Sequence, residues 1–399
     1  MKFKNLLLLG GLSVALFGCT HDDVATTNPT PTPSDELNGT LELDVSVAQL
    51  GPAGKTRAVD SSVLDGAKTN LNMARILLLS NLGHGFTVSE IKDLLPSYEL
   101  GDIKRQFKSF EFTSYGDKIS SVAITANMPT KFKPGIGISL DEVKKELLST
   151  SFDVIQPGLK SEDKDGVKNV PLYGVGSVKK NTDRNYLAIL TLKPQVARIQ
   201  VYNTIAYKEE LVEDVKITRL FLDNFIEHGS SANQKFSVGR KVGQELDNVL
   251  SKYKRIFEIN DLGIPVYPKG GDKVYAYHVF PQKATNDLNP KNRGVRLILK
   301  IDYFDKVQKK NRSGYATLRL TKYAIGKDLE EGAIDIDPAL LYSIDLGVID
   351  WDGNGVYEEN PDKFEPGFID ETPNAIQQDL AVAVEVIPWQ DAMVIPTPY

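Results

Sequence analysis

Two segments near opposite ends of the chain alternate apolar and polar residues with a period of two. The first places its apolar residues at Leu41, Leu43, Val45 and Val47. The second places them at Leu380, Val382, Val384 and Val386. Successive side chains of a β-strand point to opposite faces of a sheet, so each segment predicts a strand with one buried face. A chain with such strands at both ends is restricted to folds built largely from sheets.

Further apolar segments, each bounded by Gly, Pro, Asn or Asp, predict additional strands between these two. In the first part of the chain they cover residues 74–80, 120–128 and 185–192, with one capped helix at 139–150. In the second part they cover residues 195–207, 214–226, 273–281, 294–305, 315–325 and 340–349. Because Pro194 ends the strand before it, we predict a domain boundary there. The expected fold is mainly β, with a few short helices and two β-sandwich domains at 40–192 and 193–399.

Residues 1–19 resemble a bacterial lipoprotein signal peptide. Lys2 and Lys4 precede an apolar run at 6–17, which is too short to span a bilayer. Cys19 follows this run and is the only cysteine among 399 residues, so it cannot form a disulfide within the chain. We predict that Cys19 is acylated and anchors the precursor in the outer membrane. The alternative is a small buried hydrophobic residue without a chemical role.

Residues 20–39 are rich in Thr and Pro and contain few residues that could join a core. This composition favours an extended chain, so we predict a tether between the lipid and the folded part. Asp22 and Asp23 follow the cysteine closely and resemble a signal for export to the cell surface. The alternative is that these two acids only keep the tether soluble.

The charge and the motifs of the chain exclude several classes of function. The net charge is −6, with 47 basic and 53 acidic residues, which argues against nucleic acid as a partner. The sequence contains no H-E-x-x-H motif, no G-x-S-x-G elbow, no P-loop and no Cys after position 19. We therefore predict neither an enzyme nor a bound cofactor.

One acidic loop follows the pattern of a calcium ligand set. Asp350, Asp352 and Asn354 stand at alternate positions before Gly355, as in the first half of a calcium-binding loop. Pro361 stands where such a loop places its bidentate Glu. The alternative is a turn that needs Asp, Asn and Gly for its backbone conformation. The three residues are therefore only a weak calcium candidate.

Several of these segments together resemble the fimbrillin family of Bacteroidetes, the shaft subunits of type V pili. The similar segments are SSVAITANM with GISLDEVKKELLS in the first domain, and QVARIQV, IDPALLYSIDL and AVAVEVIPWQ in the second. The resemblance covers nearly all of the chain and implies two domains of the transthyretin-like type. It also implies location at the cell surface, first as an outer-membrane lipoprotein and then in a fimbria.

The resemblance further implies a maturation step and a mode of assembly. In the family an Arg-specific protease cuts the precursor after its first strand, and here the matching bond joins Arg57 to Ala58. The cut would remove the first strand, at 40–57, and open a groove that a donor strand of another subunit fills. That donor would be the segment 380–399, with Leu380, Val382, Val384 and Val386 facing the groove. Alternatively, Arg57 is an ordinary surface residue and the last strand completes its own domain.

The resemblance thus implies a pilus subunit that serves adhesion and polymerises with copies of itself or related subunits. Two other functions stay open from the sequence. The chain could cap the tip or anchor the base of a pilus, or it could be a monomeric surface lipoprotein that binds glycan. Glycan binders present exposed aromatic rings, and the only tryptophans here are Trp351 and Trp389.

Overall fold

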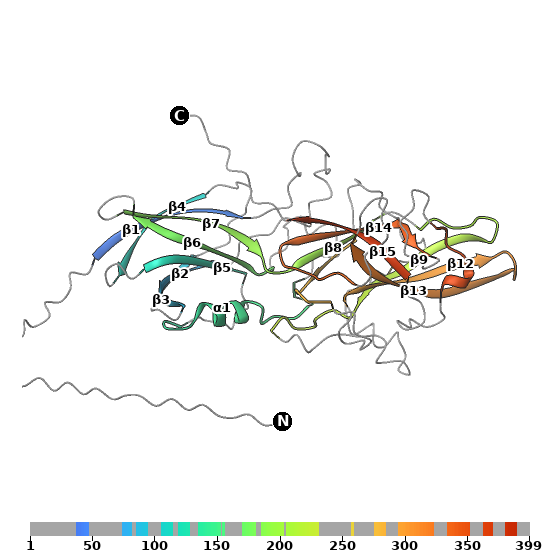
Figure 1. Cartoon of the computed structure of the whole chain (residues 1–399), viewed down its shortest axis with the longest axis horizontal. Coiled ribbons are helices and arrows are strands. Elements are labelled where there is room, and N and C mark those ends of the chain that lie inside the picture. Colours follow the sequence, from blue (N-terminus) through green and yellow to red (C-terminus); the bar gives the residue numbers. More distant parts are fainter. Residues whose placement is uncertain are drawn as a thin grey trace, which may run out of the picture.

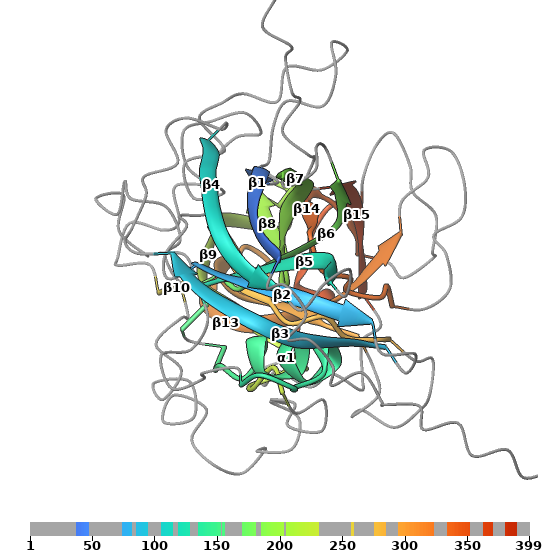
Figure 2. The ribbon, with the colours of Figure 1, turned by 90° about the vertical axis from the view of Figure 1, so that its left-hand side faces the viewer.

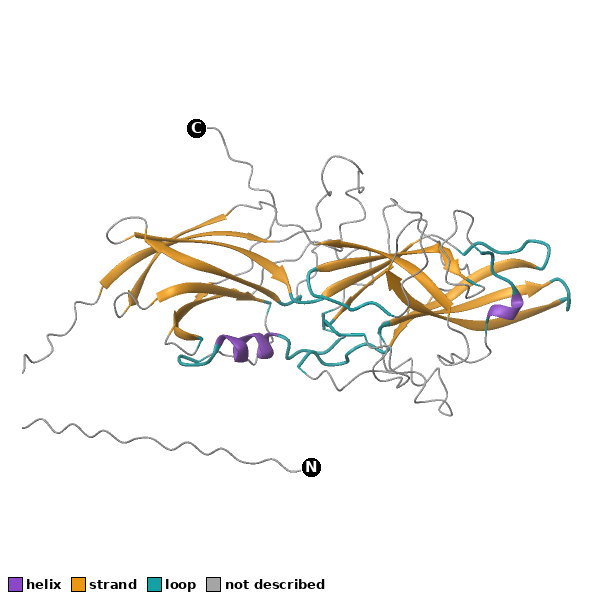
Figure 3. Cartoon of the chain, viewed as in Figure 1, coloured by secondary structure: helices purple, strands orange, loops and turns teal. Residues whose placement is uncertain are grey.

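The computed structural model shows two β-sheets that lie end to end along an elongated molecule (Figure 1). It describes residues 37–47, 74–81, 85–94, 105–114, 119–127, 135–152, 154–155, 170–180, 185–202, 205–230, 257–258, 275–284, 294–322, 333–351, 362–369 and 380–388. Figure 3 shows that strands dominate this part of the chain. The prediction of a mainly β fold with two sandwich-like domains is confirmed.

The first sheet has seven strands in the order β3-β2-β5-β6-β7-β1-β4. We call the part of the chain that carries it the N-terminal half. Its strands are β1 (Leu37–Val47), β2 (Ala74–Asn81), β3 (Phe86–Leu94), β4 (Arg105–Ser114), β5 (Ile119–Ala126), β6 (Leu172–Lys180) and β7 (Asn185–Pro194).

The second sheet has eight strands in the order β10-β9-β12-β13-β15-β14-β8-β11. It forms the C-terminal half, which the chain enters directly after β7. Its strands are β8 (Ala197–Tyr202), β9 (Val212–Asp223), β10 (Phe257–Glu258), β11 (Tyr275–Val279), β12 (Arg296–Asp305), β13 (Lys310–Lys322), β14 (Leu340–Asp350) and β15 (Leu380–Pro388). A short 3-10 helix, η4 (Pro366–Phe368), precedes β15.

Most of the predicted strands are found where the alternation and the turn residues placed them. β7 ends at Pro194, as predicted, and the boundary between two domains at this point stays a prediction that the change of sheet supports. The strands β3, β4, β6 and β10 lie outside the predicted segments.

The predicted helix is α1 (Leu140–Leu147), and its capping residues fix where it begins. The Ser139 hydroxyl accepts a hydrogen bond from the Glu142 amide, and the Glu142 carboxylate accepts one from the Ser139 amide. The Ser139 hydroxyl also donates to the Glu142 carboxylate, and this hydrogen bond, together with that from the Ser139 amide, lowers the pKa of Glu142. The apolar side of α1 covers one face of β2, β3 and β5, where Val143 packs with Leu77 and Leu79 (Figure 2).

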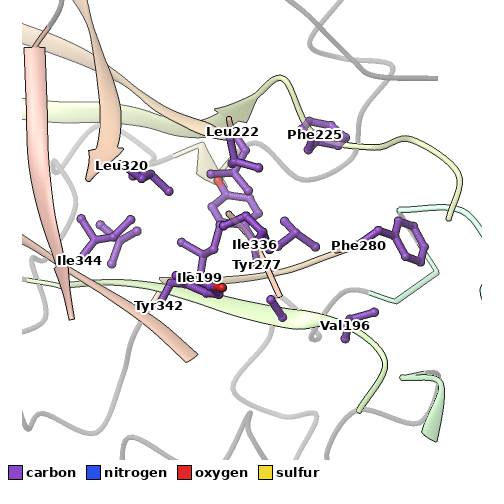
Figure 4. Close-up of a cluster of buried hydrophobic side chains, with 14 of the residues drawn as sticks. Val196, Ile199, Leu222, Phe225, Tyr277, Phe280, Leu320, Ile336, Tyr342 and Ile344 are labelled. Carbon is purple, nitrogen blue, oxygen red and sulfur yellow. The ribbon is translucent and has the colours of Figure 1, made fainter. Parts of the chain in front are cut away.

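The main hydrophobic core runs without interruption from one half into the other. It contains Leu41 and Ile124 of the N-terminal half as well as Ile199 and Leu320 of the C-terminal half. Figure 4 shows the part of this core in the C-terminal half, in which Phe280 lies towards the N-terminal half. With a single cysteine in the chain, packing of this kind carries the stability of the fold.

Candidate functional site

The first strand of the structure lies inside its sheet rather than at an edge. β1 runs parallel to β7, with Leu41 opposite Tyr186 and Val45 opposite Leu190. On its other side β1 runs antiparallel to β4. Among the described strands, β4 pairs only with β1. Removal of β1 would therefore separate β4 from the rest of the sheet and expose two rows of unpaired backbone groups.

The inward side chains of β1 belong to the main core. Leu41, Leu43 and Val45 are all buried, as the alternation predicts. The opposite face of β1 is more open, since Asp44 is half-buried. Asp44 lies opposite Ile189 of β7, whose side chain is 64% exposed. The slot that β1 fills thus has an apolar floor and a partly solvated outer side.

The last strand occupies an equivalent position in the other sheet. β15 runs parallel to β13 and antiparallel to β14, and the Thr321 hydroxyl of β13 donates a hydrogen bond to the Val382 carbonyl. Leu380, Val382 and Val384 are buried in the core, but Val386 is 39% exposed. The alternative that the last strand completes its own domain therefore describes this structure. Whether β15 also acts as a donor stays a prediction.

β15 differs from β1 on its second face. Ala381 is 0% exposed, so β15 is buried on both sides at this position, whereas Asp44 at the middle of β1 reaches solvent. An alanine suits this place because it fills little volume and carries no polar group. The arrangement offers two interior slots with the same strand directions, each filled by an apolar series of the same spacing.

The other predicted site residues lie mostly outside the described residues. This holds for Cys19, for Arg57 and Ala58, for Asp352 and Asn354, and for Trp389. Asp350 is the last residue of β14 and is buried. Within the described ranges, no group of three or more His, Cys, Asp and Glu could hold a metal ion. The calcium loop stays untested.

Trp351, one of the two tryptophans considered for glycan binding, follows the end of β14 and is fully buried. Its ring lies 5.2 Å from that of Phe364 and 6.1 Å from that of Phe368. Both partners come from the segment around η4, on the far side of the acidic loop that follows Trp351. The indole therefore stabilises the core and offers no exposed ring to a sugar.

Three buried polar residues of the C-terminal half were also missed. Arg198 of β8 and His278 of β11 face each other with 3.4 Å between Nη1 and Nε2. Burial lowers the pKa of Arg198 to about 9. Tyr342 has its pKa raised to about 12, mainly by burial, and its hydroxyl bonds with the backbone of Asp335 and Asp337. Alternating patterns reveal no such residues, because they occupy core positions where apolar side chains are expected.

Comparison with known proteins finds similar folds but no similar sequences. No family model and no curated protein matches the chain. A candidate cell adhesion protein from Parabacteroides distasonis has a TM-score of 0.54 at 13% identity, over 90% of this chain and 99% of that one. A second, from Bacteroides eggerthii, has a TM-score of 0.44 at 12% identity, over 88% and 96% of the two chains. A fimbrial assembly protein from Parabacteroides distasonis has a TM-score of 0.35 at 13% identity, over 78% and 92%.

The TM-score of 0.54 shows that this chain shares the fold of the cell adhesion protein from Parabacteroides distasonis, so the predicted resemblance is confirmed for the fold. At such low identity the likeness concerns the fold alone. Among the helices in the described residues, none is long and apolar enough to cross a membrane.

Proposed function

We propose that this protein is a structural subunit of a cell-surface fimbria, made as an outer-membrane lipoprotein and polymerised by exchange of β15 into the slot of β1. The observation that carries the proposal is the equivalence of these two strands. Each lies inside a sheet, parallel to one neighbour and antiparallel to the other, and each buries an apolar series of period two. The similar fold of a candidate cell adhesion protein supports a role at the cell surface rather than in catalysis.

The shared strand directions fix the orientation of β15 in the slot of β1. Aligning the two apolar series from their first residues then gives one register for the exchange. Leu380 takes the place of Leu41, Val382 that of Leu43, and Val384 that of Val45. In this register Val386 takes the place of Val47, which lies opposite Leu192 of β7. Leu192 is buried, so Val386 would gain apolar contacts that it lacks in its own sheet. Burial of one such side chain contributes about 1.5–3 kcal/mol.

The outer face also favours β15 in the slot of β1. In this register Ala381 lies beside Leu187, and Ala383 lies beside Ile189, the two positions that β1 fills with Glu42 and Asp44. An alanine next to an exposed isoleucine covers part of its apolar surface. A carboxylate at the same position must stay hydrated and therefore leaves the isoleucine exposed. The exchange thus replaces a polar neighbour of β7 by an apolar one.

The two halves respond differently to the loss of the inserted strand. Without β15, strands β10-β9-β12-β13 stay paired with one another, and so do β14-β8-β11. Two complete smaller sheets can still pack as a sandwich. Without β1, strand β4 loses its described neighbour altogether. The N-terminal half therefore gains more from a donor strand than the C-terminal half loses by giving one.

Cleavage at Arg57 would supply the empty slot, and the resulting contact is head-to-tail. The donor surface and the acceptor surface differ, so the contact does not close into a dimer and builds a filament. The filament can grow without an energy source such as ATP at the site of assembly, because proteolysis removes β1 and so makes its slot free for a donor strand. Other partners in this scheme are the Arg-specific protease and, for the precursor, the outer membrane.

The test is a titration of the full chain carrying Cys19→Ser with an Arg-specific protease, which leaves the neighbouring Lys55 intact, followed by N-terminal sequencing and size measurement. We expect a new N-terminus at Ala58 and a ladder of oligomers. The variant Arg57→Gln keeps the same fold and should remain monomeric under the same conditions. A cleanly cut chain that stays monomeric would overturn the polymer and leave an anchoring, tip or glycan-binding lipoprotein.

A further inference from the structure

A segment of the N-terminal half crosses over and joins the edge of the C-terminal half. It follows α1 in the chain and forms an antiparallel bridge in which Ser151 lies opposite His228. The Phe152 amide donates to the Glu227 carbonyl at 2.9 Å, and the Gly229 amide donates to the Thr150 carbonyl at 3.0 Å. Two segments from different halves thus share a short piece of β-ladder.

Apolar packing accompanies these hydrogen bonds. The rings of Phe152 and Phe225 are stacked with their centroids 4.0 Å apart, and both side chains are buried. The backbones come so close that a Cβ at Gly229 would lie 2.5 Å from the Leu148 carbonyl oxygen and 2.5 Å from the Phe280 ring. Only glycine allows this approach.

A buried histidine forms a third connection between the halves. His278 Nδ1 lies 2.8 Å from the Ile155 carbonyl oxygen. A carbonyl can only accept, so Nδ1 carries the proton and donates it. Nε2 of the same neutral ring is then an acceptor, and it faces Arg198 Nη1, a guanidinium donor. His278 therefore positions Ile155 against the C-terminal sheet.

We propose that Thr150, Ser151, Phe152 and Ile155 form an interdomain clasp that holds the two sheets as one rigid body. Within the described residues, the chain otherwise passes between the sheets at the short connection from Pro194 to Ala197, around which the two halves share the main core. A second attachment from a different part of the chain adds to this shared core and restrains rotation about the connection.

The clasp can be tested in the uncleaved monomer, so its outcome does not depend on polymerisation. The first test introduces Ser151→Cys and His228→Cys into the chain carrying Cys19→Ser, which has no other thiol. The pattern of hydrogen bonds makes Ser151 and His228 a non-hydrogen-bonded pair, in which Cα atoms approach closely enough for a disulfide. We expect complete cross-linking on mild oxidation and unchanged dimensions in solution.

The matched control pairs Ser151→Cys with Glu227→Cys. Adjacent residues of a strand point to opposite faces, so this pair should cross-link at least tenfold more slowly. Equal rates for the two pairs, or no cross-link in the first, would overturn the clasp.

A second test uses calorimetry and does not need a disulfide. We expect the parent chain to unfold in a single transition, and Gly229→Ala to split it into two or to lower its first part. Gly367→Ala is the control, because a Cβ at that position meets no atom within 4 Å. A single unshifted transition for Gly229→Ala would contradict the clasp. If Gly229→Ala does not fold, the cross-linking of Ser151→Cys with His228→Cys still tests whether the clasp exists.

Discussion

β1 and β15 occupy the same kind of slot but differ on the face that points away from the core. The inward series are alike, with Leu41, Leu43 and Val45 in one and Leu380, Val382 and Val384 in the other. The outward residues of β1 are acidic, and Asp44 reaches solvent, whereas Ala381 of β15 is completely buried. On its second face β15 begins with Ala381 and Ala383 and reaches a charge only at Glu385, which is exposed.

This difference gives the proposed exchange a direction. β15 can enter the slot of β1 without burying a charge. In the reverse exchange β1 would bring Glu42 to the buried position of Ala381, directly beside Asp350 of β14, and like charges opposite each other are destabilising. The proposed exchange of β15 into the slot of β1 is therefore favoured over the reverse.

The largest effect is expected for Ala381→Asp, which gives β15 the outward chemistry of β1. Ala381 lies between Arg319 of β13 and Asp350 of β14, so a carboxylate at this buried position meets a like charge as well as a cation. Burying it costs several kcal/mol, and the unfolding free energy of the uncleaved chain should fall by about 3–5 kcal/mol. Denaturant unfolding measures this. A loss below about 1 kcal/mol would mean that the second face of β15 is open to water, and the comparison with β1 would fail.

A smaller effect is expected for Leu43→Ala, which shortens a buried side chain of β1. Loss of contacts and the resulting cavity should cost the uncleaved chain about 2–5 kcal/mol. After the cut at Arg57 the strand is gone, so the variant and the parent should have equal stability. Unfolding curves before and after treatment with the Arg-specific protease test both statements. A difference that persists after cleavage would show that β1 remains bound.

The smallest effect is expected for Val386→Ala. Because Val386 is 39% exposed in its own sheet, the monomer should lose no more than about 0.5 kcal/mol. In the proposed register the side chain enters the groove opposite Leu192, so each subunit contact should lose about 1.6 kcal/mol, the value for two methyl groups. Dissociation of oligomers in denaturant measures the second quantity. Equal effects on monomer and polymer would contradict the register.

The sequence predicted which residues form these strands but not where the strands lie. The alternation at Leu41–Val45 and Leu380–Val384 identifies the buried face, because that face depends only on the period of the strand. An interior place between one parallel and one antiparallel neighbour depends on contacts with β7 and β13, which are distant in sequence. Local patterns carry no information about such contacts.

The same reason explains the errors at single residues. Val386 continues the apolar series, yet β15 extends past the part of the core that would cover it. Trp351 follows a strand and precedes a polar loop, so nothing nearby in the sequence indicates that Phe364 will enclose it. The contacts of Ser151 and Phe152 with the C-terminal half were missed for a similar reason, since a short irregular segment after a helix has no distinctive pattern.

The clasp has a mechanical consequence for a filament of such subunits. A chain of two-domain subunits can bend at the joint within each subunit and at the contact between subunits. If the joint within the subunit is fixed by Phe152 and its neighbours, only the contact between subunits remains as a place to bend. The flexibility of the fibre, and with it the distance over which it can reach from the cell, would then be set by the donor strand and its groove alone.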